Sequence, residues 1–151
     1  VAYASSGSYG TEALYLMLES TAEKRGLKPL ARFLCHSSFA QAPESFTTAP
    51  VGAINNVLES VGWKANDVDL FEINEAFAVV TMAAMKDLDL PVEKVNIHGG
   101  ACALGHPVGA SGTRILVTLI SALKKYGKTR GVAGLCIGGG EATAMAIEVM
   151  S

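Results

Sequence analysis

The amino-acid sequence predicts one layered α/β domain with a five-stranded mixed sheet. Helical and extended hydrophobic patterns alternate along the chain, as is typical of α/β domains in which helices connect successive strands. The 151 residues, half of them hydrophobic, are enough for one core. The last two extended segments, 131–137 and 142–149, are too close for a helical crossover and predict a hairpin. We expect the order β-α-β-α-β-α-β-β after an opening helix, with a mainly parallel sheet and an antiparallel terminal strand.

The first half of the chain predicts an opening helix, a strand and a second helix. The opening helix ends at Gly26, and a strand over 30–37 follows it. The apolar face of the opening helix consists of Ala13, Leu14, Met17, Leu18 and Thr21. Pro50 is typical of the first turn of a helix, with Thr47 or Thr48 as the N-cap. The buried side of this second helix consists of Ile54, Val57, Leu58 and Val61.

The second half predicts two more strands and two more helices before the terminal hairpin. A strand over 68–73 precedes a helix for which Asn74 stands at the N-cap position. The apolar face of this helix consists of Phe77, Val80, Thr81, Ala84, Met85 and Leu88. A short extended segment over 95–97 precedes a glycine-rich passage, 99–112, which leads into the last helix. The buried stripe of the last helix consists of Ile115, Leu116, Leu119, Ile120 and Leu123.

The composition argues against several classes of protein. The formal charge is -2, with 12 basic and 14 acidic residues and no basic cluster, so neither nucleic acid nor an anionic membrane is an expected partner. No apolar run approaches the roughly 20 residues that span a bilayer, and residues 1–6 lack the pattern of a signal peptide. Three cysteines without paired spacing predict free thiols rather than a disulfide framework or a zinc ribbon. We expect a soluble, cytoplasmic protein.

Two reactive side chains stand beside flexible backbone. His106 lies between Gly105 and Pro107, and because a residue before proline avoids the α region, its imidazole sits on a constrained turn. Such an imidazole can move a proton or polarise a carbonyl oxygen, but a histidine that only satisfies its loop fits the same residues. Cys136 ends an apolar run, either as a small buried hydrophobe or as a thiol beside the amides of 138–140, which suit an oxyanion site. The pair suits proton transfer on a thioester.

Asn74 and the glycine-rich passage each allow two interpretations. Asn74 is a good N-cap at a strand-to-helix junction, and its amide is equally able to hold a water or a carbonyl at a reacting centre. His98, Cys102 and His106 are spaced four residues apart, as metal ligands on a helix would be. Glycines and a proline in this passage oppose a helix, so we expect no metal site. The passage also fits no nucleotide-phosphate motif.

Three motifs together resemble the active-site motifs in the C-terminal half of the thiolase family. They are Asn74-Glu75-Ala76-Phe77, the passage from Gly99 to Gly112 that contains Gly105-His106-Pro107, and Cys136-Ile137-Gly138-Gly139-Gly140. Their order and spacing resemble the family from about residue 7 to residue 148, and the likeness is closest to biosynthetic acetyl-CoA acetyltransferases. The resemblance implies a three-layer, thiolase-like C-terminal domain over 1–151.

The resemblance implies a role for each matching residue. In this family a nucleophilic cysteine is acylated by an acyl-CoA, and the carbanion of a second acetyl-CoA attacks that acyl group; the reverse reaction cleaves a 3-ketoacyl-CoA. His106 would activate the nucleophile and help bind the thioester oxygen, with Asn74 supporting it through a bound water. Cys136 would move the α-proton and protonate the leaving thiolate. The N–H of Gly138 would join the oxyanion hole of the acyl-enzyme.

The resemblance also implies what the chain needs from elsewhere. The nucleophile and most of the CoA-binding loop region belong to an N-terminal half without counterpart here, and Cys35 lacks the nucleophile's surroundings. We expect a C-terminal domain that is inactive alone, whether an expressed piece, a processed fragment or a truncated gene product. Acyl-CoA would be a substrate beside Ala76 and Phe77, with no cofactor. The full-length protein would be a homo-oligomer.

Two further expectations concern the start of the chain and the alternative function. The passage 5–10 departs from the asparagine-aspartate-glycine pattern that family members carry near the start of this domain, so the first strand of the domain is either absent or remade. The alternative to an enzyme part is a non-catalytic module of the same fold that acts in assembly or binds CoA weakly.

Overall fold

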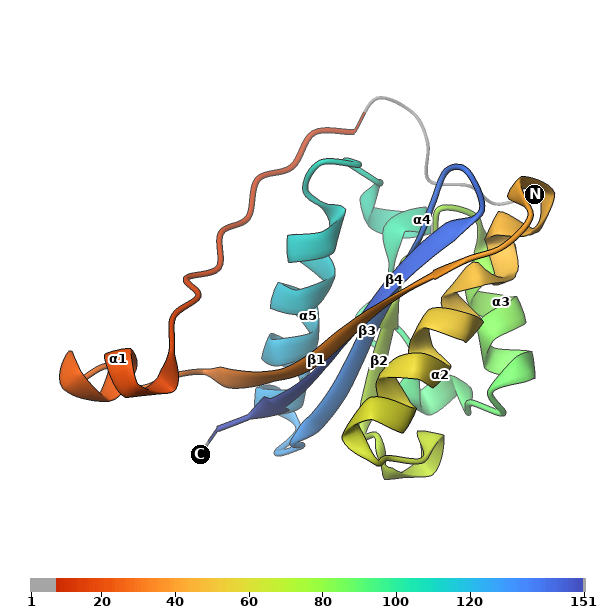
Figure 1. Cartoon of the computed structure of the whole chain (residues 1–151). Helices are drawn as coiled ribbons and strands as arrows, with labels where there is room; N and C mark the ends of the chain where they lie inside the picture. Colours follow the sequence, from red (N-terminus) through yellow and green to blue (C-terminus); the bar gives the residue numbers. More distant parts are fainter. Residues whose placement is uncertain (1–7, 151) are drawn as a thin grey trace.

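The computed structural model describes residues 8–150, and within them four strands form one sheet with helices on both sides (Figure 1). The strands are β1 (Ala31–Ala40), β2 (Leu70–Ile73), β3 (Arg130–Ile137) and β4 (Glu141–Val149). The helices are α1 (Glu19–Lys24), α2 (Ala49–Val61), α3 (Ala78–Asp87), α4 (Ala101–Leu104) and α5 (Ser111–Lys125), with 3₁₀ turns at Pro43–Thr48, Ala65–Asp67 and Val92–Lys94. None of the helices in this range is long and apolar enough to cross a membrane. The absence of a signal-peptide pattern concerns residues 1–6, which lie outside the described residues. Residues 5–7 of the passage that departs from the family pattern lie outside them as well.

The sheet has the order β1-β4-β3-β2. β2 and β3 are parallel, whereas β4 is antiparallel to both of its neighbours. The predicted terminal hairpin is confirmed, because Ile137 pairs with Glu141 and 138–140 form the loop between them. The expectation of a mainly parallel sheet holds only in that β1, β2 and β3 run in the same direction. Because β4 lies between β3 and β1, two of the three neighbouring pairs are antiparallel.

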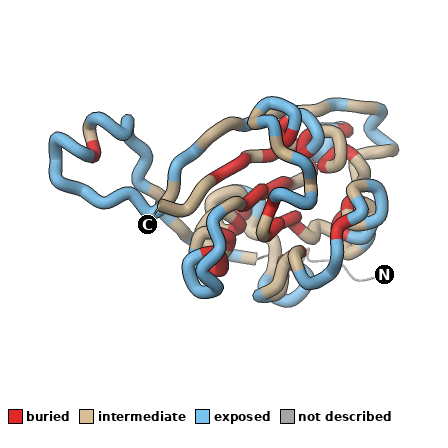
Figure 2. Tube along the Cα trace, turned by 90° about the horizontal axis from the view of Figure 1, so that it is seen from below, coloured by how far each residue is buried: buried red, intermediate tan, exposed pale blue. Residues whose placement is uncertain are grey.

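Helices on both faces of the sheet give the three layers that were expected (Figure 1). α2 packs against β1, β4 and β3, with α3 beside it, and α5 covers β2 and β3 from the other side. One apolar cluster lies under α2 and includes Ile54, Phe71 and Val132, and a second lies under α5 and includes Leu70 and Leu119. Figure 2 shows the buried residues concentrated in this layered body, while the arm that carries α1, residues 8–30, is mostly exposed.

The expected fifth strand over 95–97 is wrong. Val95 makes a single parallel bridge to Phe71, and Asn96 then has a φ of +47°, which ends the extended backbone. The Asn96 side chain takes over the next rung of the ladder. Its Oδ1 accepts the Ile73 N–H at 2.8 Å, and its Nδ2 donates to the Ile73 carbonyl at 2.8 Å. An asparagine side chain, instead of a fifth strand, therefore satisfies the backbone at the end of β2.

The expected opening helix is also largely wrong. Residues 8–18 contain no helix, and only α1 is helical within the predicted span. The apolar side chains of this segment have little to pack against, since Tyr15 is 92% exposed and Leu16 is 82% exposed. Helices in proteins gain most of their stability by burying one face. The hydrophobic period of this segment is therefore not enough to make it helical.

Candidate active site

Polar residues of the predicted site gather at the carboxyl ends of β2 and β3. These parallel strands lie side by side with Ile73 opposite Gly134, and Asn74 extends the pairing by donating its N–H to the Gly134 carbonyl at 2.9 Å. Cys136 lies two residues beyond Gly134 on β3. Open α/β sheets commonly bind ligands at the carboxyl ends of their strands. The fold thus brings Asn74 and Cys136, which are far apart in the sequence, to the same end of the sheet.

Asn74 is not the N-cap that its sequence position suggests. α3 begins at Ala78 with Phe77 at the N-cap position, and the Asn74 side chain turns to His106 instead. Asn74 is 1% exposed, and its Nδ2 lies 3.4 Å from Nε2 and 3.5 Å from Nδ1 of His106. Its buried Oδ1 has no hydrogen-bond partner among the described residues. Because an unpaired buried amide oxygen is costly, it marks a place for a water or a ligand.

Ser111 determines which nitrogen of His106 carries the proton. The buried Ser111 hydroxyl donates to the Pro107 carbonyl at 3.1 Å, so its oxygen accepts from His106 Nδ1, which lies 2.5 Å away. The neutral ring therefore keeps its proton on Nδ1 and leaves the lone pair on Nε2. The Asn74 amide donates toward that lone pair. Nε2 is the basic atom of the site.

The turn that carries His106 is held from its N-terminal side. His106 lies outside any helix, as its position before proline predicts, and the preceding Gly105 has a φ of +92°. A Cβ on Gly105 would lie 2.5 Å from Ser8 Oγ, the oxygen that accepts the His106 N–H at 3.3 Å. Burial, and secondarily the charge of Arg114, lower the pKa of His106. The imidazole is therefore neutral at pH 7 and able to act as a base.

Glu75 joins the Asn74 segment to the glycine-rich passage. Its Oε1 accepts from Asn96 Nδ2 at 2.9 Å, and its Oε2 accepts from the Cys102 backbone N–H at 3.0 Å. Gly100 makes room for this carboxylate, because a Cβ at that position would overlap it. One glutamate thus fixes the start of α4 against the end of β2, and so sets the position from which the chain continues to His106.

Cys136 and Gly138 occupy the end of the neighbouring strand. Cys136 is buried, and burial raises the pKa of its thiol, so the thiol is protonated at neutral pH. It shares one face of β3 with Val132 and Gly134, which face α2, whereas His106 belongs to the segment that enters α5 on the other face. Gly138 is exposed in the hairpin loop, where it carries no side chain to cover its N–H. A molecule lying across this end of the sheet would have the imidazole on one side and the thiol on the other.

Ala76 and Phe77 lie between β2 and α3, and both are half-buried. The Phe77 ring packs edge-on against Phe46 of the 3₁₀ turn before α2, with the ring centroids 6.0 Å apart. An apolar surface therefore adjoins the polar groups around Asn74.

Two other candidates from the sequence lie away from this site. Cys35 is on β1, at the opposite edge of the sheet from β2, and its thiol donates to the His36 carbonyl. His98 Nε2 lies 3.3 Å from the hydroxyl of Tyr126, just past the C-terminal end of α5, whereas His106 is held at the N-terminal end of that helix. An α-helix of 15 residues is about 22 Å long, so the two imidazoles cannot share a metal ion.

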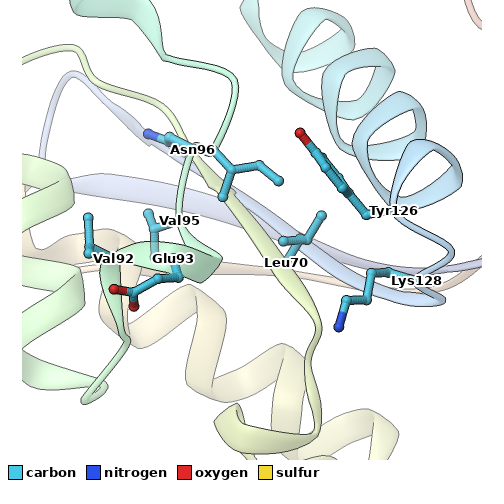
Figure 3. Close-up of a pocket in the computed structure, with 8 residues that line it drawn as sticks. Leu70, Val92, Glu93, Val95, Asn96, Tyr126 and Lys128 are labelled. Carbon is cyan, nitrogen blue, oxygen red and sulfur yellow. The ribbon is translucent and has the colours of Figure 1, made fainter.

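A cavity of about 600 Å³ lies beside the edge strand β2 (Figure 3). Its walls come from the start of β2, the turn at 92–94 and the segment after α5. The lining residues are Leu70, Val92, Glu93, Val95, Asn96, Ile97, Tyr126 and Lys128. A smaller cavity of about 330 Å³ borders the turn after His106 and is lined by 8–12 and 107–110, with Thr113. Of these two cavities, the smaller one borders the segment that follows His106.

Three residues that contact or underlie this site were not assigned a role from the sequence. Ser111 stood within the glycine-rich passage, and Glu72 and Arg114 stood within regular elements. Glu72 is 2% exposed, and Arg114 reaches it from α5, with Nη1 3.4 Å from Glu72 Oε2. Burial raises the pKa of Glu72 to about 7; Arg114 opposes this rise and Glu75 adds to it. A glutamate inside an apolar strand was the available signal, because carboxylates are rarely buried without a specific reason.

In Ser111→Ala, the neutral His106 ring is expected no longer to be restricted to the tautomer protonated on Nδ1. Without the hydroxyl oxygen, Nδ1–H loses its acceptor and the neutral ring shifts toward the form protonated on Nε2. The lost hydrogen bond also lowers the free energy of unfolding by about 1 kcal/mol. The nitrogen-15 NMR shifts of the imidazole measure the position of the proton. Ser60→Ala is the matched control, since the Ser60 hydroxyl also donates to the carbonyl four residues earlier, on an exposed part of α2. An unchanged Nδ1–H form in Ser111→Ala would contradict the assignment.

Comparisons with known proteins identify the family of this chain. Residues 27–149 match the family model for the C-terminal domain of thiolase. The cytosolic acetyl-CoA acetyltransferase of Mus musculus is 53% identical over 147 residues, which cover 97% of this chain and 37% of that protein. The acetyl-CoA acetyltransferase of Escherichia coli strain K12 is 50% identical over 139 residues, covering 92% of this chain and 35% of that protein.

Solved structures show the same fold. The Bacillus anthracis acetyl-CoA acetyltransferase superposes with a TM-score of 0.87 at 46% identity, covering 89% of this chain and 34% of the other. Human mitochondrial 3-ketoacyl-CoA thiolase in complex with CoA gives 0.86 at 39% identity, covering 88% and 34%. The chain spans about a third of the length of these relatives. The family match, together with the fold and the three ordered motifs, shows that this chain belongs to the thiolase family and contains its C-terminal domain.

Proposed function

We propose that this chain is the C-terminal catalytic half of an acetyl-CoA C-acetyltransferase. The complete enzyme would condense two acetyl-CoA molecules into acetoacetyl-CoA, or cleave acetoacetyl-CoA in the reverse direction. The observation that supports this function is the chain of hydrogen bonds from Pro107 through Ser111 to His106, with Asn74 beside the ring. It presents a basic nitrogen and an unpaired amide oxygen at the carboxyl end of β2. The relatives from mouse and E. coli bear the name of this activity.

His106 would act first as a base and then as a hydrogen-bond donor. Its Nε2 lone pair takes the proton from the nucleophilic thiol of the N-terminal half, and the thiolate attacks the carbonyl carbon of acyl-CoA. Once protonated, Nε2–H points at the thioester oxygen of the second acetyl-CoA. The lowered pKa of His106 supports the first step, because the ring must be neutral to accept a proton. The bond to Ser111 supports both steps, because it keeps one proton on Nδ1 and leaves Nε2 to exchange the other.

Cys136 would complete the proton transfers. Its thiol first protonates the CoA thiolate that leaves during acylation, and the resulting Cys136 thiolate then removes the α-proton of the second acetyl-CoA. The carbanion attacks the acyl group, whose oxygen the Gly138 N–H stabilises, and the nucleophile leaves as thiolate. The raised pKa of Cys136 supports a thiol that starts in its acid form.

Asn74 and the adjoining apolar surface would position the substrate. A water held by the unpaired Oδ1 of Asn74 would donate to the enolate oxygen, which Nε2–H of His106 also binds. Ala76 and Phe77 would line the acyl-CoA pocket. Acyl-CoA enters as a substrate, and each step is a proton or acyl transfer that needs no cofactor.

The partners we propose are the N-terminal half of the enzyme and further copies of the complete subunit. The exposed apolar side chains of the arm, among them Tyr15, Leu16 and Leu18, support contact with such a partner. The names of the mouse and rat relatives place those two proteins in the cytosol. We propose a cytosolic location here as well, with a mitochondrial or peroxisomal one left open.

The 151-residue chain alone is expected to show no thiolysis of acetoacetyl-CoA by CoA, because it lacks the nucleophile. A chimera, in which this chain replaces the matching C-terminal segment of the mouse relative, is expected to be active. The rate of acetoacetyl-CoA consumption measures both. Activity of the chain alone that disappears on Cys35→Ser would overturn the assignment of the nucleophile to another segment. A chimera that folds and binds CoA but does not turn over would favour the non-catalytic alternative.

A further inference from the structure

A buried pair of charges lies next to the contact between Asn74 and His106. Glu72 is almost fully buried on β2, and Arg114 approaches it from α5, with Nη1 3.4 Å from Glu72 Oε2. The Arg114 side chain is only 12% exposed, and its Nη1 also donates to Thr118 Oγ1 at 3.3 Å. The guanidinium is therefore held between a strand and a helix, with little contact with solvent.

The spacing along both elements makes this pair the neighbour of the His106 contacts. Side chains two residues apart on a strand share a face, so Glu72 lies on the same side of the sheet as Asn74. Side chains three residues apart on a helix are neighbours, so Arg114 lies beside Ser111. Asn74 and Ser111 both contact the His106 ring. The imidazole and the guanidinium therefore lie next to each other along the space between β2 and α5.

Arg114 keeps its charge whatever the state of Glu72. A guanidinium does not lose its proton at ordinary pH, whereas the pKa of Glu72 is raised to about 7, chiefly by burial. As the pH falls below 7, the carboxyl becomes neutral and the charge of Arg114 is no longer balanced. A second positive charge nearby is then unfavourable, and after burial Arg114 is the cause that lowers the pKa of His106. Glu75 also acts on Glu72, and β3 places the uncharged Ala133 opposite it.

We propose that Arg114 is a positioning residue of this site: Glu72 and Thr118 hold its guanidinium beside the imidazole of His106, where the buried positive charge disfavours a second positive charge on the ring. As an account of catalysis this rests on the function proposed above. As a statement about His106 it does not, because the protonation of the ring can be measured in the chain without turnover. Arg114 acts through His106 and is not assigned any contact with substrate.

The test is a titration of the histidine side chains of the 151-residue chain by nitrogen-15 NMR, with the His106 signals assigned by their loss in His106→Asn. In Arg114→Gln the pKa of His106 is expected to rise toward the ordinary value of about 6.5. Arg114→Lys retains a charge and is expected to keep the pKa low. Glu72→Gln resembles the protonated carboxyl and is expected not to raise it. Arg130→Gln is the control, since Arg130 lies over the Trp63 ring, away from this site.

Either of two results in the single variants would overturn the proposal. One is a His106 pKa that stays the same in Arg114→Gln. The other is an equal rise in Arg114→Gln and Glu72→Gln, which would mean that loosened packing, not the charge, had changed the ring. If Arg114→Gln alone does not fold, the double variant Glu72→Gln with Arg114→Gln leaves no unpaired buried carboxyl and is expected to show the same rise. An unchanged pKa there would also overturn the proposal.

The failure of this inference differs from a failure of the proposed function. In an active chimera, Arg114→Gln is expected to move the acid limb of the kcat/KM profile to higher pH, in step with the His106 pKa. If the chimera is inactive but the NMR shifts follow the expectation, the proposed function fails and the effect of Arg114 on His106 stands. If the chimera is active and neither the pKa nor the acid limb moves, only the inference fails.

Discussion

His106→Asn is expected to reduce acetoacetyl-CoA thiolysis by the chimera by about 10²- to 10⁴-fold, the usual contribution of a general acid or base. Asparagine fits the space and can still donate a hydrogen bond, but it cannot carry a proton from the nucleophile. The loss should therefore fall mainly on kcat, measured under saturating acetoacetyl-CoA. His98→Asn is the matched control, because His98 is bonded to Tyr126 at the far end of α5. A loss of similar size in His98→Asn would mean that the assay reports folding and not the site.

Cys136→Ser is expected to cause a loss of the same order for a related reason. The serine hydroxyl is nearly the same size but a much weaker acid, so it neither protonates the leaving thiolate nor removes the α-proton efficiently. Cys35→Ser is the matched control, because Cys35 lies on β1 at the opposite edge of the sheet. Full activity in both His106→Asn and Cys136→Ser would show that the proton transfers belong to other groups.

Periodic hydrophobic segments predicted the elements that bury one face. The stripe of Leu119 and Leu123 and that of Ile54 and Val57 became the helices α5 and α2, because each found a sheet face to cover. The opening segment has a similar period but no such surface within 8–150, and Tyr15 and the residues around it remain exposed. Periodicity therefore predicts a helix only where the rest of the chain supplies a surface to bury it.

The hydrogen bonds of individual polar side chains were not predictable in the same way. Asn96 ends an extended segment and replaces a rung of the ladder with its amide, and no hydrophobic pattern shows this. Asn74 occupies a good N-cap position, but the helix begins four residues later and its amide faces His106. The motifs placed Asn74 and His106 in one site, while the hydroxyl of Ser111 that orients the ring became visible only through the distances between atoms.

Glu72→Gln is expected to make the chain more stable at alkaline pH. The pKa of Glu72 is raised from 4.5 to about 7 in the folded chain, so folding favours the protonated carboxyl. Its contribution to stability is therefore complete below about pH 4.5 and is lost as the pH rises through 7. The difference between these pKa values corresponds to about 3 kcal/mol, an order-of-magnitude figure for a buried group that is coupled to Arg114. Glutamine has nearly the same shape and no proton to lose, so it avoids this loss.

Urea unfolding of the unsubstituted chain and of Glu72→Gln at pH 4.5 and pH 8.5 measures this effect. The two unfolding curves are expected to coincide at pH 4.5. At pH 8.5, Glu72→Gln is expected to be more stable by up to about 3 kcal/mol. Glu93→Gln is the control, because Glu93 is exposed and surface substitutions usually change stability by no more than about 0.5 kcal/mol. A difference that is equal at the two pH values would contradict a buried, titrating carboxyl. A difference that grows with pH would mean that the Glu72 carboxyl is present near His106 although it lowers the stability of the fold. Such a cost is expected where a charged residue contributes to a functional site.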